Sequence, residues 1–218
     1  MTKRPQLAGT LWLLAGLLYL TSEAIAASAF AGYSYAKDYI SDLGVPYTLA
    51  DGTVSPLAWL MNFGGFILDA LLYGAAAVVA VSARRPRHRA VMAFLVLAMI
   101  HTAGSILVGT VHSGPREIAA GTHHIHVIGA AMAIIGGNAA SIVASRLAAP
   151  GAYRRTSLTL GLFGLASLVT LEINRLSGTP ILPEGLLERG SVYTITGWEI
   201  LTGLTLLFTK RRLLESRG

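Results

Sequence analysis

The chain has 218 residues, of which 53% are hydrophobic and 13% are charged. A soluble domain usually carries about 25% charged residues, so the composition favours a membrane protein over a soluble one. Lys and Arg outnumber Asp and Glu by 17 to 11, and there is no cysteine. The absence of cysteine excludes disulfide bonds, thiolate catalysis and thiolate metal sites.

Long apolar blocks recur along the chain, and about 20 apolar residues are enough to cross a bilayer as a helix. The blocks are rich in Leu, Ala and Gly and lack the alternation of β-barrel strands. We therefore predict an all-α membrane protein, a bundle of six transmembrane helices that forms one domain over residues 1–218. The predicted loops are short, and the longest outer loop joins the first two helices. The predicted helices are about 8–30, 56–82, 91–111, 124–147, 157–176 and 191–208.

Basic residues are distributed unevenly among the connecting segments. Segments that share one side of a six-span bundle hold 13 of the 17 Lys and Arg residues. Because Lys and Arg are retained in short cytoplasmic loops, both termini are predicted to be cytoplasmic. Topology in a plasma membrane thus explains the basic excess, and no nucleic-acid partner is expected. The cytoplasmic set is Lys3, Arg4, Arg84, Arg85, Arg87, Arg89, Arg146, Arg154, Arg155, Lys210, Arg211, Arg212 and Arg217, and the opposite set is Lys37, Arg116, Arg175 and Arg189.

Some ionisable residues lie inside the predicted spans, where a charge near the bilayer centre costs about 2.5–3.5 kcal/mol on insertion scales. Asp69 and His101 fall near the middle of two consecutive helices, so they are expected to meet as a buried pair. Glu199 lies near the middle of the last span, and Asn62 lies two turns before Asp69 on the same helix face. These residues either hold helices together through hydrogen bonds or form a relay in a small proton-coupled transporter.

A second polar group lies near the outer ends of the predicted helices. Its members are Glu23, Asp42, His112, His126 and Glu172. Glu172 and Arg175 are three residues apart on a helix, so they share a face and can form an ion pair. The concentration of histidines and carboxylates on one side predicts a polar cavity that opens outward.

The outer histidines allow two kinds of chemistry. Three imidazoles with one open position make a catalytic zinc site, and His112, His123 and His126 can supply the nitrogens, with Asp42 or Glu172 as the general base. No H-E-x-x-H motif supports this site, and histidines at a membrane interface are common without a metal. The alternative is metal-free chemistry, in which a carboxyl group in an apolar site acts as acid or base.

Three segments of the chain resemble a known family. They are Tyr33–Gly44 with the following Asn62-Phe63, then Leu107-Val108-Gly109 with His112 and residues 123–129, and finally residues 185–189. Together they resemble the bacterial and archaeal integral membrane proteins called domain of unknown function 998, a resemblance that implies six helices and no established activity. The outer loop also resembles that of a eukaryotic six-helix family that includes a lipid-remodelling factor for GPI anchors, which favours lipid chemistry by analogy. The resemblance highlights Ser41, Asp42, Asn62, His112, His126 and Arg189.

These observations lead to three functional hypotheses. The first is an intramembrane hydrolase or transferase that acts on a lipid or lipid-like molecule at the outer leaflet. The second is a non-enzymatic protein that binds a lipid or a partner protein, and the third is the small proton-coupled transporter. Membrane lipid is the expected partner, and the oligomeric state is left open. Expected catalytic residues are Glu23, Asp42, His112, His126 and Glu172, and expected substrate-binding residues are Ser41, Asn62, Asp69, His101, Arg175, Arg189 and Glu199.

Overall fold

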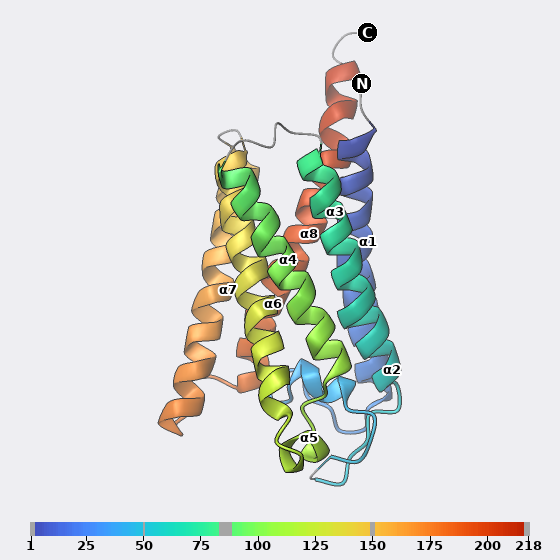
Figure 1. Ribbon diagram of the computed structural model, residues 1–218, viewed down its shortest axis with the longest axis vertical. Helices are drawn as coiled ribbons and strands as arrows, with labels where there is room; N and C mark the ends of the chain where they lie inside the picture. The colour runs from blue at the N-terminus through green and yellow to red at the C-terminus, as the bar shows by residue number, and fades with distance from the viewer. Residues whose placement is uncertain (1–2, 50, 83–88, 149–150, 216–218) are drawn as a thin grey trace.

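The computed structural model describes residues 3–49, 51–82, 89–148 and 151–215, with side chains as far as Phe208. In these ranges every regular element is a helix. Figure 1 shows a bundle in which α1 begins and α8 ends at the same end, here called the terminal end. The opposite end, which carries η1 and α5, is called the loop end. The elements are α1 (Arg4–Ala29), the 3₁₀ helix η1 (Ile40–Gly44), α2 (Ala58–Leu60), the π-helical segment η2 (Met61–Leu68), α3 (Asp69–Ser82), α4 (Arg89–Thr110), α5 (Pro115–Ala119), α6 (His123–Leu147), α7 (Ala152–Ser177) and α8 (Glu184–Glu215).

Each predicted apolar block falls on a helix and extends at most two residues beyond its ends, and α2, η2 and α3 follow one another as one continuous helix. Five helices are long and apolar enough to cross a membrane, namely Arg4–Ala29, Ala58–Ser82, Arg89–Thr110, His123–Leu147 and Ala152–Ser177. The described part of α8, which contains the sixth predicted span, is not among them. Its apolar sequence is interrupted by Glu199 and several threonines, of which Thr196 and Thr202 are buried, as Glu199 is. A helix whose polar side chains face other helices needs fewer apolar residues than one surrounded by lipid.

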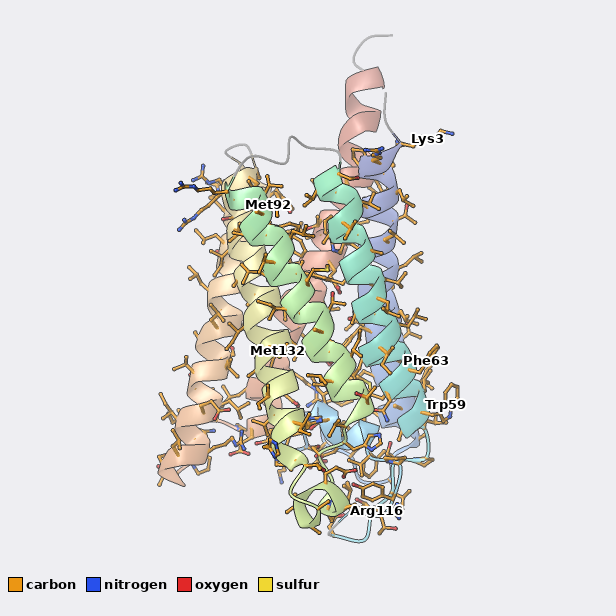
Figure 2. All side chains as sticks on the ribbon, viewed as in Figure 1. Lys3, Trp59, Phe63, Met92, Arg116 and Met132 are labelled. Atoms are coloured by element: carbon orange, nitrogen blue, oxygen red, sulfur yellow. The ribbon has the colours of Figure 1, made fainter. Side chains whose placement is uncertain are left out.

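Most of the basic residues whose side chains the structure describes lie at the terminal end of the bundle. Lys3 lies at the terminal end and Arg116 at the loop end (Figure 2). At the terminal end Arg4 Nη1 donates a hydrogen bond to the Ser82 carbonyl oxygen at 2.9 Å, which joins the start of α1 to the end of α3. Of the predicted cytoplasmic set, Arg89, Arg146, Arg154 and Arg155 belong to helix ends at this same end. Outside the described residues lie Arg84, Arg85, Arg87 and Arg217, together with the side chains of Lys210, Arg211 and Arg212.

Small residues allow α4 and α6 to approach closely. A Cβ atom built on Gly104 would lie 2.5 Å from the carbonyl oxygen of Gly129, and one on Gly136 would lie 2.7 Å from the backbone nitrogen of His101. Both neighbours are backbone atoms of the partner helix, so only glycine fits at these two positions. Membrane helices commonly associate through such small residues, because packing replaces the hydrophobic effect inside lipid.

Two apolar clusters fill the interior. The cluster on the terminal side contains four large aromatic side chains, namely Trp12, Tyr73, Phe94 and Trp198. Their rings meet edge to face or tilted, with Trp12 and Trp198 centroids 5.3 Å apart. The cluster on the loop side includes Tyr19, Phe30, Ile40, Leu43, Met61, Phe66 and Val108. The polar groups described next lie between these clusters and beyond the second one, at the loop end.

Candidate functional site

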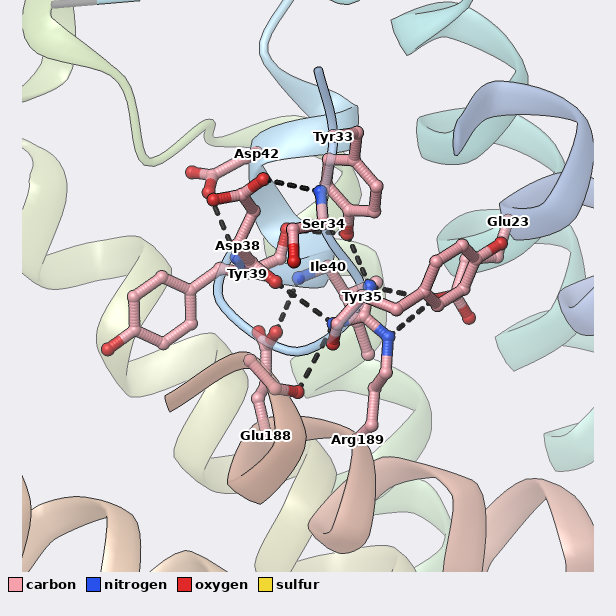
Figure 3. A network of polar contacts seen from close by, with 11 residues as sticks. Glu23, Tyr33, Ser34, Tyr35, Asp38, Tyr39, Ile40, Asp42, Glu188 and Arg189 are labelled. Atoms are coloured by element: carbon pink, nitrogen blue, oxygen red, sulfur yellow. Dashed lines mark hydrogen bonds and ion pairs between the residues drawn. The ribbon is translucent and has the colours of Figure 1, made fainter. Parts of the chain in front are cut away.

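The longest connection, residues 30–57, folds over the loop end and is held there by Arg189 of α8 (Figure 3). Its guanidinium binds the Glu23 carboxylate through Nε and Nη2, both at 3.1 Å. Its Nη1 donates to the carbonyl oxygens of Tyr35 at 2.6 Å, Asp38 at 2.9 Å and Gly185 at 3.1 Å. The second hydrogen bond of Nη2 goes to the Tyr33 hydroxyl. One arginine therefore joins α1, the outer connection and α8.

In this arrangement Glu23 and Arg189 stabilise the fold at the loop end. Glu23 was predicted as a catalytic residue and Arg189 as a binding residue, and the two are 166 positions apart in the sequence. They form an ion pair in which the side chains are 1% and 5% exposed. Every nitrogen of the guanidinium already has an acceptor, so Arg189 holds the outer connection in place and leaves no donor for a ligand.

Asp42 and its neighbours shape the start of η1. The Asp42 carboxylate accepts a hydrogen bond from the backbone nitrogen of Tyr39 at 3.0 Å, and Glu188 of α8 accepts one from the backbone nitrogen of Ile40. Burial raises the pKa of the Asp42 carboxyl to about 6, although the Tyr39 hydrogen bond acts in the opposite direction. Ser41, which precedes Asp42 in the sequence, lines the interior cavity described below.

The outer histidines do not converge on one point. His112 Nδ1 lies 3.6 Å from Glu117, whose carboxylate also accepts a hydrogen bond from the Tyr47 hydroxyl. His126 is buried, and its Nδ1 donates to the Val111 carbonyl oxygen at 2.6 Å. The rings of His123 and His126 are nearly parallel with centroids 6.3 Å apart. Among the described residues, these three predicted zinc ligands do not form a group whose donor atoms all lie within 4.8 Å of one another.

Glu172 and Arg175 lie apart from this arrangement. They form the expected ion pair, with Arg175 Nη1 3.2 Å from Glu172 Oε1. The two side chains are 48% and 42% exposed. The pair lies near the loop end of α7, the helix with the least buried apolar window of the five. Neither residue lines the interior cavity.

A cavity of about 60 Å³ lies between the two apolar clusters. Because roughly 10–15 Å³ by this measure is enough for one water molecule, the cavity has room for several. Its polar lining comes from the outer loop, α1, α3, α4, α6 and α8. Tyr19, Ser105, Glu188 and Thr196 were not predicted as site residues, although Thr196 is three residues from Glu199 and so shares its helix face. The polar lining residues are Tyr19, Ser41, Asp69, Ser105, His101, His126, Glu188, Thr196 and Glu199.

Asp69, His101 and Glu199 come together deep in this cavity. One donor atom from each lies within 4.8 Å of the others, and the three residues are 5%, 5% and 1% exposed. Asp69 Oδ1, His101 Nε2 and Glu199 Oε1 are buried without a hydrogen-bond partner. The other imidazole nitrogen, His101 Nδ1, donates to the Ala133 carbonyl oxygen at 2.8 Å. We call these three residues the central triad.

The π-helical segment η2 lies directly before Asp69, one of the three residues of the central triad. Asp69 follows its last residue, and Gly65 and Phe66 of the segment line the cavity. A π segment inserts an extra residue into a helix turn, and such segments occur frequently at functional sites. Asn62, also in η2, donates from Nδ2 to the Gly44 carbonyl oxygen at 2.7 Å and so ties the helix to the outer loop. Asn62 therefore supports the site without lining the cavity.

These features define a multi-pass helical protein of the membrane type with a polar cavity inside its bundle. The chain matches the family model described as Protein of unknown function (DUF998) over residues 13–205, and it belongs to that family. The resemblance expected from the outer loop and the histidine segments is thereby confirmed. Neither a curated protein nor a solved structure matches the chain significantly.

Proposed function

We propose that this protein is a small carrier that binds a cation at the central triad, inside a six-span bundle of the plasma membrane. The observation behind the proposal is the pair of buried carboxylates, Asp69 and Glu199. Neither has a Lys or Arg partner within the part of the chain that the structure describes. Charged carboxylates inside a membrane protein are costly unless a positive charge accompanies them. A mobile cation is the positive charge that the proposal supplies.

The position of the cavity supports entry from the loop end. Glu188 and Glu199 both line it and are eleven residues apart on α8, which corresponds to about 16 Å along a helix axis. Ser41 lines the cavity from the outer connection. Toward the terminal end, Tyr73 lies one helical turn beyond Asp69, and Phe94 lies two turns beyond His101. The aromatic cluster therefore closes the path on the terminal side, and a carrier would open it in a second conformation.

The carrier is expected to move a cation through the central triad. Vesicles containing the wild-type protein are expected to take up at least one of protons, Na⁺, K⁺ and Zn²⁺ faster than protein-free vesicles, as read from trapped ion-sensitive dyes. Asp69→Asn keeps the shape of the side chain and removes its charge, so uptake should fall about tenfold or more, in line with a loss above 1.4 kcal/mol of cation binding.

Glu172→Gln is the matched control, because it removes the charge of an exposed carboxylate outside the cavity. Its uptake should equal that of the wild type. Uptake by the wild-type protein that does not exceed the protein-free background contradicts the carrier. An effect of Glu172→Gln as large as that of Asp69→Asn would show that the variants act through the fold.

The proposed topology places both termini in the cytoplasm, in keeping with the basic residues of the terminal end. The cysteine-free chain allows a direct test by single substitutions at exposed positions. Asp51→Cys at the loop end is expected to react with a membrane-impermeant thiol reagent on intact cells. Arg155→Cys at the terminal end should react only after the cells are permeabilised. The reverse labelling pattern would place the terminal end outside.

A lipid-directed function at the outer leaflet is the second candidate. Its support is Asp42, half-buried beside the cavity residue Ser41, because displaced carboxyl pKa values gather at functional sites. The geometry favours it less, because Glu172 is exposed and does not line the cavity, and a cavity of about 60 Å³ is small for a lipid. A change in copurifying lipid in Asp42→Asn, without a change in cation uptake, would favour this candidate over the carrier.

A further inference from the structure

The central triad offers one nitrogen and two oxygen donors that have no partner. His101 Nε2, Asp69 Oδ1 and Glu199 Oε1 come from α4, α3 and α8, and all three lie at the wall of one cavity. We infer that this site binds a divalent transition-metal ion such as Zn²⁺. The inference rests on the proposed function, because it makes this ion the cargo of the carrier. Each of the three residues has a buried donor atom without a hydrogen-bond partner, and the three residues are 5% exposed or less, which separates them from an ordinary surface acidic cluster.

The hydrogen bond of His101 prepares its ring for a metal. Histidines that ligate metals almost always donate their second ring nitrogen to a carbonyl or carboxylate, which orients the ring and selects the tautomer. His101 Nδ1 donates to the Ala133 carbonyl oxygen at 2.8 Å, so the lone pair of Nε2 is available. Gly137 leaves room for this ring, because a Cβ atom there would lie 2.9 Å from His101 Nδ1.

Charge and donor type decide the class of ion. Two carboxylates balance the charge of a divalent ion, whereas a monovalent ion leaves one negative charge uncompensated in an apolar interior. Imidazole suits Zn²⁺, Fe²⁺, Ni²⁺ and Cu²⁺, while Mg²⁺ and Ca²⁺ prefer sites made only of oxygen. The chain has no thiolate for soft ions such as Cu⁺. The donor set therefore points to a divalent ion of the first transition row.

The spacing of the donors is compatible with one shared ion. One ligand atom from each of the three residues lies within 4.8 Å of the other two, and ligands of a tetrahedral Zn²⁺ with bonds of about 2.0–2.2 Å are roughly 3.3–3.6 Å apart. Small side-chain rotations close that difference. The fourth position faces the cavity, where a water molecule completes the coordination, as in zinc sites with three protein ligands.

The test uses the full-length protein in detergent, stripped of metal with a chelator and titrated with Zn²⁺ alone. One Zn²⁺ per chain is expected to bind. Asp69→Asn and His101→Gln should each weaken binding by about 100-fold or more, because even outer-shell changes cost about 10–100-fold. X-ray absorption of the bound zinc should show one imidazole nitrogen and at least two oxygens at about 2.0–2.2 Å.

The outer histidines provide the matched control. The double variant His112→Ala/His123→Ala removes two of the three alternative ligands and is expected to bind Zn²⁺ as the wild type does. Thermal unfolding of each variant separates a lost ligand from a lost fold. Absence of stoichiometric binding, or a zinc spectrum with three imidazoles that the double variant abolishes, overturns the inference.

The two proposals fail in different ways. If the protein binds zinc at the central triad but transports no cation into vesicles, the carrier is contradicted and the metal site is supported. If the protein takes up protons, Na⁺ or K⁺ but binds no Zn²⁺, the metal site is contradicted and the carrier is supported.

Discussion

Replacing Arg189 with methionine is expected to destabilise the protein by about 3–5 kcal/mol, the usual cost of removing one partner from a buried ion pair. The variant leaves the Glu23 carboxylate buried without its positive partner. It also leaves the carbonyl oxygens of Tyr35, Asp38 and Gly185 without the donor that joins them to α8. Equilibrium unfolding in mixed detergent micelles measures the loss, and the outer connection should become sensitive to proteases.

The chain contains a matched pair for comparison. Arg175 also binds a glutamate, but at an exposed site, and such pairs contribute about 0–1 kcal/mol. Arg175→Met should therefore have little effect on the free energy of unfolding. Glu23→Leu combined with Arg189→Met should be less destabilised than the sum of the single variants, with a coupling energy of about 1–3 kcal/mol. Equal losses for Arg175→Met and Arg189→Met would contradict the assignment of Arg189 as the residue that holds the outer connection.

The second large effect is expected at the contact between α4 and α6. In Gly104→Ala the new methyl group would lie 2.5 Å from the Gly129 carbonyl oxygen and 2.7 Å from Met132 Cβ. Because the first of these atoms belongs to backbone, the helices must separate, and overpacking of this kind costs about 1–3 kcal/mol. Gly104→Leu should cost more and reduce the yield of folded protein. The same unfolding measurement applies.

This helix contact also sets the position of His101. The ring of His101 binds the carbonyl oxygen of Ala133, and the backbone of His101 lies against Gly136. Separation of α4 and α6 by Gly104→Ala should therefore weaken Zn²⁺ binding as well as stability. Gly197→Ala is the control, because a Cβ atom there meets nothing within 4 Å. Since alanine favours a helix over glycine by about 1 kcal/mol, Gly197→Ala should be neutral or stabilising, and a loss as large as that of Gly104→Ala would contradict the packing argument.

Some contacts of the candidate sites can be predicted from positions in the sequence, and others cannot. Asp69 and His101 are expected to be neighbours because they lie at similar depth on consecutive helices, and the structure places them together with Glu199. Glu172 and Arg175 pair as the three-residue spacing predicts. In contrast, the donor atoms of His112, His123 and His126 do not meet at a common point, although the three residues lie on the same side of the bundle. The side on which a residue lies does not decide which helix faces pack together.

The helices and the grouping of basic residues at their ends can be predicted from the amino-acid sequence alone. Apolar blocks of this length form helices because the backbone inside a membrane must satisfy its own hydrogen bonds, which is a local requirement. Only the packing of distant helices pairs Arg189 with Glu23 across 166 positions and gathers the aromatic side chains of the terminal side in one cluster. It also decided that α8 carries its polar residues inward. These features depend on which faces of distant helices pack together, and that choice follows from glycine contacts and side-chain shape summed over the whole bundle.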